Sequence, residues 1–167
     1  LKDSIHIQKL AKSNNNFVQC GFIERFNPTI SSLKNILKKN KTINIDFMRT
    51  NKLSSRIKDV DVVVDLMVHD IDLALYLNGP VERVFAFNKK ERNRIVFSNA
   101  ILNHKNGSPS RLQASRITEK KIRSLEVTTK EEFIEAELLQ KVLIVNKQSQ
   151  ILEDNNIPYQ IDSIRQQ

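Results

Sequence analysis

Residues 65–77 read Asp-Leu-Met-Val-His-Asp-Ile-Asp-Leu-Ala-Leu-Tyr-Leu, an apolar run interrupted by three aspartates and one histidine. Apolar residues cover nearly every face of the helix that this stretch predicts, so we expect the helix to be buried on most sides. Asp59 or Asp61 can cap its start, and the Asn-Gly-Pro sequence at 78–80 predicts its end. Because charged side chains are costly to bury without partners, the charges inside this helix need an explanation.

The segments on either side of this helix predict an α+β fold. Before it, residues 2–13 and 28–39 have helical spacing, with Asn27 and Pro28 as the start of the second helix. Residues 17–23 are typical of a short buried strand with Cys20 in the core, and residues 42–50 alternate as a half-buried strand does. After it come the strand-like segments 81–90, 94–104, 110–118, 121–129, 132–138 and 141–147.

Short polar turns join the later strands, which indicates an antiparallel meander. We therefore expect an α+β fold with helices packed on one face of a largely antiparallel open sheet. Residues 148–167 are polar and weakly patterned, and we expect a tail or a return segment there.

The net charge of +8 at pH 7 raises the question of a nucleic-acid partner. The basic residues are scattered along the chain and no aromatic platform accompanies them, so we expect no nucleic-acid binding. No apolar run approaches the ~20 residues that cross a bilayer, and no signal peptide is visible. We therefore expect no membrane partner and a cytoplasmic location. The chain begins with Leu1 rather than Met, which indicates a fragment.

Asp65, His69 and Asp72 lie on one stripe of the predicted helix, because positions three and four residues apart share a face. A carboxylate beside an imidazole can hold its tautomer and leave the other ring nitrogen to exchange a proton with a substrate. Two alternatives stay open: a polar pair that satisfies itself, and a metal ion. The strong zinc spacing His-Glu-x-x-His is absent, so we expect no metal. Asp70 points away from this stripe, and surface exposure or a structural pairing explains it as well as a chemical role does.

Three segments resemble the C-terminal part of the Gfo/Idh/MocA oxidoreductases. They are residues 19–28, which contain Arg-Phe-Asn-Pro; residues 59–73, which contain Asp-x-x-x-His-Asp; and residues 114–123 followed by 133–137. The resemblance covers most of residues 1–147. It implies a fold like the C-terminal domain of glyceraldehyde-3-phosphate dehydrogenase. Residues 1–23 would then be a remnant of the end of a Rossmann domain, and residues 24–147 a substrate-binding and oligomerisation domain.

The resemblance implies hydride transfer between NAD or NADP and the carbinol of a sugar-like substrate, possibly a nucleotide sugar, or of a cyclitol. It makes His69 the general acid/base and Asp65 the residue that orients it, with Arg25, Asn27 and Asp72 near the substrate. The sequence contains neither a Gly-rich dinucleotide loop nor the family's Glu-Lys-Pro motif. The missing Rossmann domain would therefore bind most of the cofactor, and the isolated fragment is expected to be inactive. The resemblance also implies a homodimer or homotetramer through the sheet face. The alternative is a non-catalytic oligomerisation or interaction module.

Overall fold

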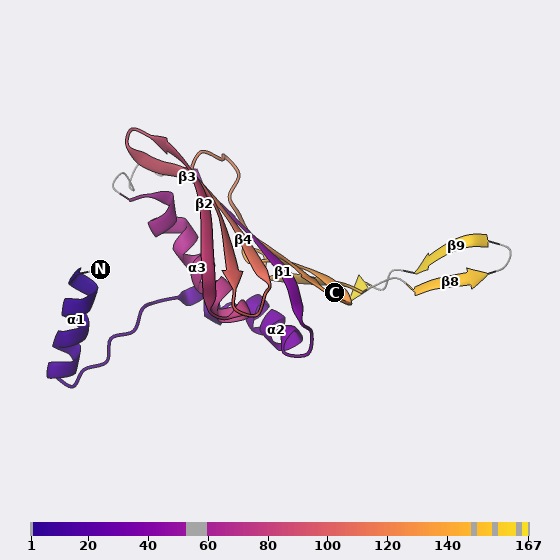
Figure 1. The fold of residues 1–167 in the computed structure, drawn as a ribbon, viewed down its shortest axis with the longest axis horizontal. Coiled ribbons are helices and arrows are strands. Elements are labelled where there is room, and N and C mark those ends of the chain that lie inside the picture. The colour runs from indigo at the N-terminus through magenta and orange to yellow at the C-terminus, as the bar shows by residue number, and fades with distance from the viewer. Residues whose placement is uncertain (1, 53–59, 148–149, 155–156, 163–164, 167) are drawn as a thin grey trace.

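The computed structural model describes residues 2–52, 60–147, 150–154, 157–162 and 165–166 (Figure 1). Its helical elements are α1 (Lys2–Ser13), the 3-10 turn η1 (Ile23–Phe26), α2 (Pro28–Leu37), the π-helical turn η2 (Val63–Met67) and α3 (Val68–Asn78). Its strands are β1 (Thr42–Thr50), β2 (Val81–Glu91), β3 (Arg94–His104), β4 (Pro109–Ser115), β5 (Ile122–Thr129), β6 (Glu132–Glu137), β7 (Val142–Lys147), β8 (Gln150–Asp154), β9 (Ile157–Asp162) and β10 (Arg165–Gln166). The predicted α+β class is confirmed.

The helix boundaries follow the local chemistry of the sequence. The Asn27 side chain accepts a hydrogen bond from the Thr29 N–H at 3.1 Å, and Pro28 occupies the first helical position of α2. At the end of α3, Gly79 has a φ of +86°, a left-handed conformation that glycine adopts without a steric penalty. Both predicted boundaries are confirmed.

The start of the buried helix differs from the prediction. The first turn is π-helical, and no side chain caps it. The Asp61 carboxylate instead accepts the backbone N–H of Ile95 at the start of β3, at 2.8 Å. The prediction of Asp61 as the cap is therefore wrong, because β3 uses this carboxylate; Asp59 lies outside the described residues.

The central sheet has the strand order β10-β7-β6-β5-β1-β4-β3-β2. β1 pairs in parallel with β4 on one side and antiparallel with β5 on the other. The other neighbours are antiparallel, which confirms a largely antiparallel sheet. The continuous meander is wrong at one place: β4 and β5 follow each other in the chain, but β1 fills the space between them. β8 and β9 form a separate two-stranded sheet.

The strand register divides the sheet into a covered face and an open face. On the covered face, inward residues of five strands are buried together with apolar residues of α2, η2 and α3. The strand members of this core include Ile45, Phe47, Ala100, Leu112, Leu125 and Ile134, and the helix members include Ile30, Leu33, Met67 and Leu73. The alternate positions point to the other face, where Asp46, Phe87, Ile101 and Arg111 line a pocket of about 530 Å³.

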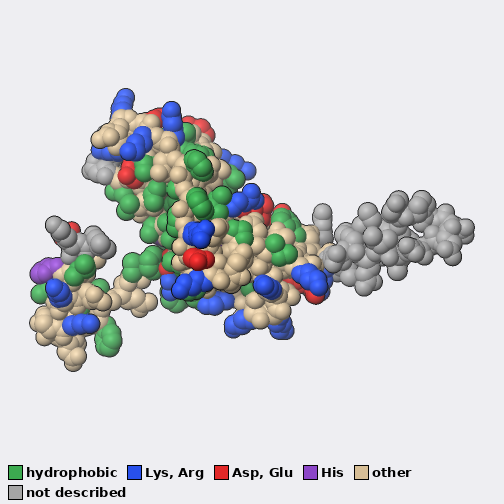
Figure 2. All heavy atoms as spheres, viewed as in Figure 1, with side chains coloured by type: hydrophobic (Ala, Val, Ile, Leu, Met, Phe, Trp, Pro, Cys, Tyr) green, Lys and Arg blue, Asp and Glu red, His purple; other side chains and the backbone are tan. Residues whose placement is uncertain are grey.

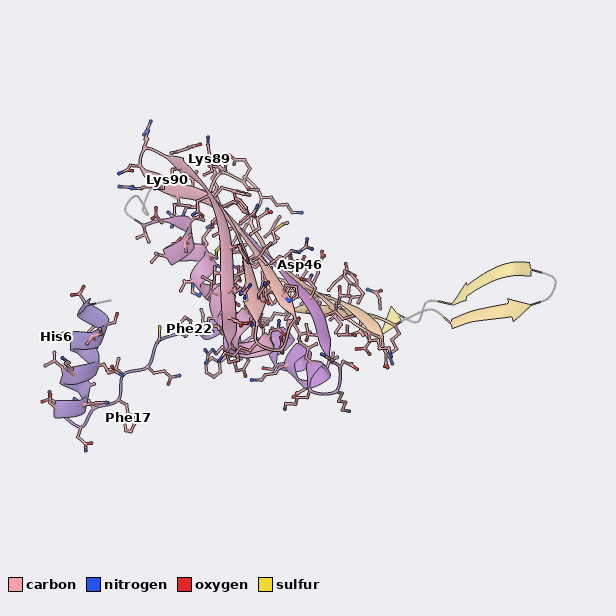
Figure 3. The ribbon with its side chains drawn as sticks, viewed as in Figure 1. His6, Phe17, Phe22, Asp46, Lys89 and Lys90 are labelled. Carbon is pink, nitrogen blue, oxygen red and sulfur yellow. The ribbon has the colours of Figure 1, made fainter. Side chains whose placement is uncertain are left out.

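Residues 14–22 carry no strand, so the predicted strand at 17–23 is wrong. Phe17 and Cys20 are exposed, and the prediction of Cys20 as a core residue is also wrong. A strand needs a neighbour to accept its backbone hydrogen bonds, and the described strands do not pair with this segment. Figure 3 shows Phe17, together with His6 on α1, away from the sheet that carries Asp46.

Basic side chains occupy several separate places on the face seen in Figure 2, including the end of the β2–β3 hairpin. Lys89 and Lys90 lie at that end (Figure 3). None of the described helices combines the length and the apolar character needed to cross a bilayer.

Candidate active site

Each of the three aspartates in the quoted stretch pairs with an arginine from another element. The pairs are Asp65 with Arg116 after β4, Asp70 with Arg49 on β1, and Asp72 with Arg25 on η1. The arginines therefore explain how a core-like helix tolerates its charges, since a buried carboxylate needs a charged or hydrogen-bonding partner.

The Asp70 pair is the most deeply buried of the three. The Nε and Nη2 atoms of Arg49 lie 2.9 and 2.7 Å from Oδ1 of Asp70, and Arg49 is only 2% exposed. Nη1 of Arg49 also donates to Glu24 at 3.2 Å, and Arg123 donates to the same Glu24 oxygen. Burial raises the pKa of the Asp70 carboxyl above its ordinary value, and the charge and hydrogen bond of Arg49 oppose that rise. Of the two alternatives for Asp70, the structural pairing is therefore confirmed.

The Asp72 pair joins α3 to η1. Arg25 donates from Nε to the Asp72 carboxylate at 2.7 Å, with a second contact from Nη2. The guanidinium also lies 5.4 Å from the ring centroid of Phe22 and 5.1 Å from that of Tyr76. The hydrogen bond to Asp72 raises the pKa of Arg25. Since the Arg25 side chain is 39% exposed, part of this cation remains accessible to solvent.

Asp65 lies in the π-helical turn and pairs with Arg116 at 2.5 Å. Arg116 is 6% exposed, so its guanidinium is held at the end of β4 beneath the helix. The structure gives Asp65 and His69 no mutual hydrogen bond among the described residues. The Asp65 carboxylate is directed to Arg116 instead.

His69, unlike the three aspartates, has no ion pair among the described residues, although Oδ2 of Asp70 is likewise buried without a hydrogen-bond partner. His69 is half-buried, and its Nδ1 atom is buried with no hydrogen-bond partner in the described part of the chain. Most buried polar atoms have a partner, so an orphan of this kind calls for a specific explanation. The three nearby aspartates do not act as its hydrogen-bond partner, because the carboxylate of each is paired with an arginine.

The Asn27 side chain makes its hydrogen bonds at the start of α2 rather than with the charged residues of α3. Its Oδ1 caps α2, and its Nδ2 donates to the carbonyl of Leu138 at 3.1 Å. The structure therefore brings Arg25 to Asp72 but leaves Asn27 at the α2 start. A substrate contact of Asn27 stays a prediction.

Sequence reasoning missed Glu24, Arg49 and Arg116. One signal was present for Arg49: it has the same strand parity as the buried Ile45 and Phe47, so the alternation of β1 places a charge on the covered face. No local pattern identified Arg116, because it follows the last residue of β4 and meets Asp65 only in the folded chain.

The described residues do not form a dinucleotide cradle. The chain has three glycines, Gly21, Gly79 and Gly107, which are too far apart in sequence to form a Gly-rich loop. Within the same described ranges, no group of three or more His, Cys, Asp and Glu side chains is arranged to hold a metal ion.

Comparisons with known proteins agree with the fold. UDP-N-acetylglucosamine 3-dehydrogenase of Acidithiobacillus ferrooxidans is 25% identical over 136 residues, which are 80% of this chain and 43% of that protein. A solved structure of this enzyme matches with a TM-score of 0.78 at 21% identity, covering 98% of this chain and 51% of its own. Levoglucosan dehydrogenase in complex with NADH matches with a TM-score of 0.77 at 16% identity, covering 99% of this chain and 51% of its own.

The chain spans less than half the length of the curated relative, and these structural likenesses show the fold alone. The sequence profile of the "GFO/IDH/MocA C-terminal domain" matches residues 42–135, which is more than half of the chain and includes the strands and helix of the candidate site. The chain belongs to the GFO/IDH/MocA C-terminal domain family.

Proposed function

We propose that this chain is the substrate-binding and oligomerisation part of an NAD(P)-dependent oxidoreductase that acts on the carbinol of a sugar-like substrate. The observation that carries the proposal is the orphan Nδ1 of His69, on a helix whose three aspartates are all paired with arginines. A π-helical turn directly before this helix gives further support, because such turns are frequent at functional sites.

His69 is the residue best suited to move the proton. Oxidation of a carbinol to a carbonyl releases a hydride, which NAD(P) accepts, and a proton from the hydroxyl group, which His69 accepts. An imidazole has an ordinary pKa near neutrality and so serves as base in one direction and acid in the other. Asp65, paired with Arg116, contacts or orients the substrate hydroxyl beside it, and the partly exposed Arg25 borders the same site.

The relatives narrow the substrate class. UDP-N-acetylglucosamine 3-dehydrogenase acts on a nucleotide-linked sugar, and levoglucosan dehydrogenase has been solved with NADH. We propose a nucleotide-linked amino sugar as the first substrate to test, with NAD and NADP as alternative cofactors. The dinucleotide-binding domain would be supplied by a segment outside this chain.

Steady-state kinetics test the proposal on the gene product that contains this chain, or on its fusion to the dinucleotide-binding part of the Acidithiobacillus enzyme. The probes are UDP-N-acetylglucosamine and levoglucosan, each with NAD⁺ and NADP⁺. We expect His69→Ala to lower kcat by about 10²- to 10⁴-fold, the usual contribution of a general acid or base. The matched control is His6→Ala on α1, which should leave kcat unchanged. Turnover of His69→Ala near the wild-type rate would contradict the acid/base role.

A non-catalytic assembly module is the second candidate, and the open face of the sheet favours it. Phe85, Phe87 and Ile101 share this face and are exposed. We propose that a second copy of the chain covers it in either case. Light scattering combined with probe titration separates the two candidates: self-association without binding of either sugar, even beside a dinucleotide-binding domain, favours the module.

A further inference from the structure

Arg49 is the most buried charged side chain of the network around the candidate site. It lies on the covered face of β1, and its guanidinium reaches Asp70 on α3 and Glu24 on η1. Its burial at 2% exposure prevents contact with a substrate that enters from solvent. Any effect of Arg49 on a reaction must therefore act through another residue.

The neighbour of Asp70 in the chain is His69, so the contact that holds Asp70 also restricts the helical turn that carries the imidazole. Nε of Arg49 donates to Oδ1 of Asp70, and Nη2 lies close to the same oxygen without hydrogen-bonding geometry. Nη1 of the same planar guanidinium donates to Glu24, so one rigid group joins α3 to η1, which a single ammonium group does not do. The contact consequently limits both rotation and sliding of α3 over β1 at this turn.

Glu24 extends the same restraint to the chain before α2. It accepts from Arg49 and from Arg123 on β5, each at 3.2 Å. The adjacent Arg25 pairs with Asp72 two residues beyond Asp70. Neighbouring residues of η1 thus hold successive acidic residues of α3, one through Arg49 and one directly.

Stability alone is a weak reason for this arrangement. A buried ion pair often contributes no more than well-packed apolar residues of the same volume would, because both charges lose their hydration. Apolar residues in place of Arg49 and Asp70 would not, however, fix the position of α3 over β1 as the ion pair does.

We propose that Arg49 is a positioning residue for His69: through Asp70 and Glu24 it fixes the turn of α3 that presents the imidazole to the substrate. The proposal rests on the proposed function for its catalytic consequence. Its structural consequence, the order of the His69 ring, can be measured without any substrate.

The test compares Arg49→Lys with Arg111→Lys. Lysine keeps the charge at both positions but loses the planar guanidinium, and Arg111 on β4 forms its ion pair with Asp46 on β1, on the open face of the sheet. The chain has three histidines, so imidazole NMR signals can be assigned from single His→Ala variants. We expect the His69 ring signals of Arg49→Lys to broaden or split, whereas those of His6 and His104 stay sharp. Arg111→Lys should leave all three unchanged.

The kinetic arm uses the assay described above. Arg49→Lys should lower kcat by about 10- to 100-fold, with KM within about twofold, since small misplacement of a reacting group has effects of this size. Asp70→Asn is the second variant, because it removes the carboxylate charge that holds the Arg49 guanidinium, and the weaker pair should change the His69 signals in the same direction, but less than Arg49→Lys does.

Each outcome decides the question. A native fold with unchanged His69 signals in Arg49→Lys and Asp70→Asn would overturn the proposal, as would loss of the fold in both variants, since that shows a purely structural role. If the His69 signals of these variants are disordered but His69→Ala turns over normally, Arg49 still restrains the His69 ring. In that case the proposed acid/base function of His69 is wrong.

Discussion

Replacing Arg49 by methionine should make the stability of the chain depend on pH. The variant leaves Asp70, only 4% exposed, without the guanidinium that pairs with it, whereas Glu24 keeps its contact with Arg123. Breaking a buried ion pair by removing one partner costs about 3–5 kcal/mol in the free energy of unfolding. This is a large part of the ~5–15 kcal/mol that stabilises a typical domain.

The sign of the pH effect follows from Asp70. Burial raises its pKa above the ordinary value of 3.8, and Arg49 is the largest influence that lowers it. Without Arg49 the pKa of Asp70 rises further, so the folded variant holds a proton that the unfolded chain releases. The free energy of unfolding of the variant should therefore fall as the pH rises above 3.8, the ordinary pKa of an aspartate, by at most about 1.4 kcal/mol per pH unit for one proton.

Urea unfolding followed by far-ultraviolet circular dichroism measures the effect, since the chain has no tryptophan for fluorescence. We expect Arg49→Met to be about 3–5 kcal/mol less stable than the wild type at pH 7.5, and this difference to shrink by up to about 2.7 kcal/mol at pH 5.5. The control is Arg111→Met, whose pair with Asp46 is largely exposed and should change stability by about 1 kcal/mol or less at both pH values. A loss below about 1 kcal/mol for Arg49→Met, or one independent of pH, would refute the reasoning.

Three further predictions concern other parts of the chain. Asn27→Ala should lower the free energy of unfolding by about 0.5–2 kcal/mol through loss of the α2 cap, measured by urea unfolding against the control Ser31→Ala. Cys20 is exposed, so a thiol reagent should label it fully in the native chain; labelling only after denaturation would contradict its position. Ile101→Arg on the open face should weaken self-association, and an unchanged mass in light scattering would show that a second copy does not cover this face.

Local chemistry predicted most of the elements. The cap at Asn27, the stop at Gly79 and the alternation of β1 depend on neighbouring residues, and the structure confirms them. The strand expected at 17–23 failed because an apolar pattern does not supply a pairing partner. The position of β1 in the sheet was missed because strands that follow each other in the chain usually lie side by side.

The candidate site was predictable only in part. The charged stripe and its exceptional position in an apolar helix were visible in the sequence, whereas Arg25 was named only through the family resemblance, as a residue near the substrate. The partners of Asp65 and Asp70 were not, because Arg49 is separated from Asp70 by 21 residues, and Arg116 follows a strand that is adjacent to the helix only in space. The pair with Arg116 also changed the expected relation of Asp65 to His69, and sequence spacing does not reveal this partner.

The position of β1 has a consequence for how the chain acquires its fold. β1 is formed by residues 42–50, but its two neighbours in the sheet are β4 and β5, at 109–115 and 122–129. During synthesis, one edge of β1 therefore stays open until β4 is complete, about 65 residues later, and the other until β5 is complete, about 80 residues later. Such long-range pairing slows folding and exposes strand edges. Before β5 is complete, the nascent chain is thus most vulnerable to association at β1.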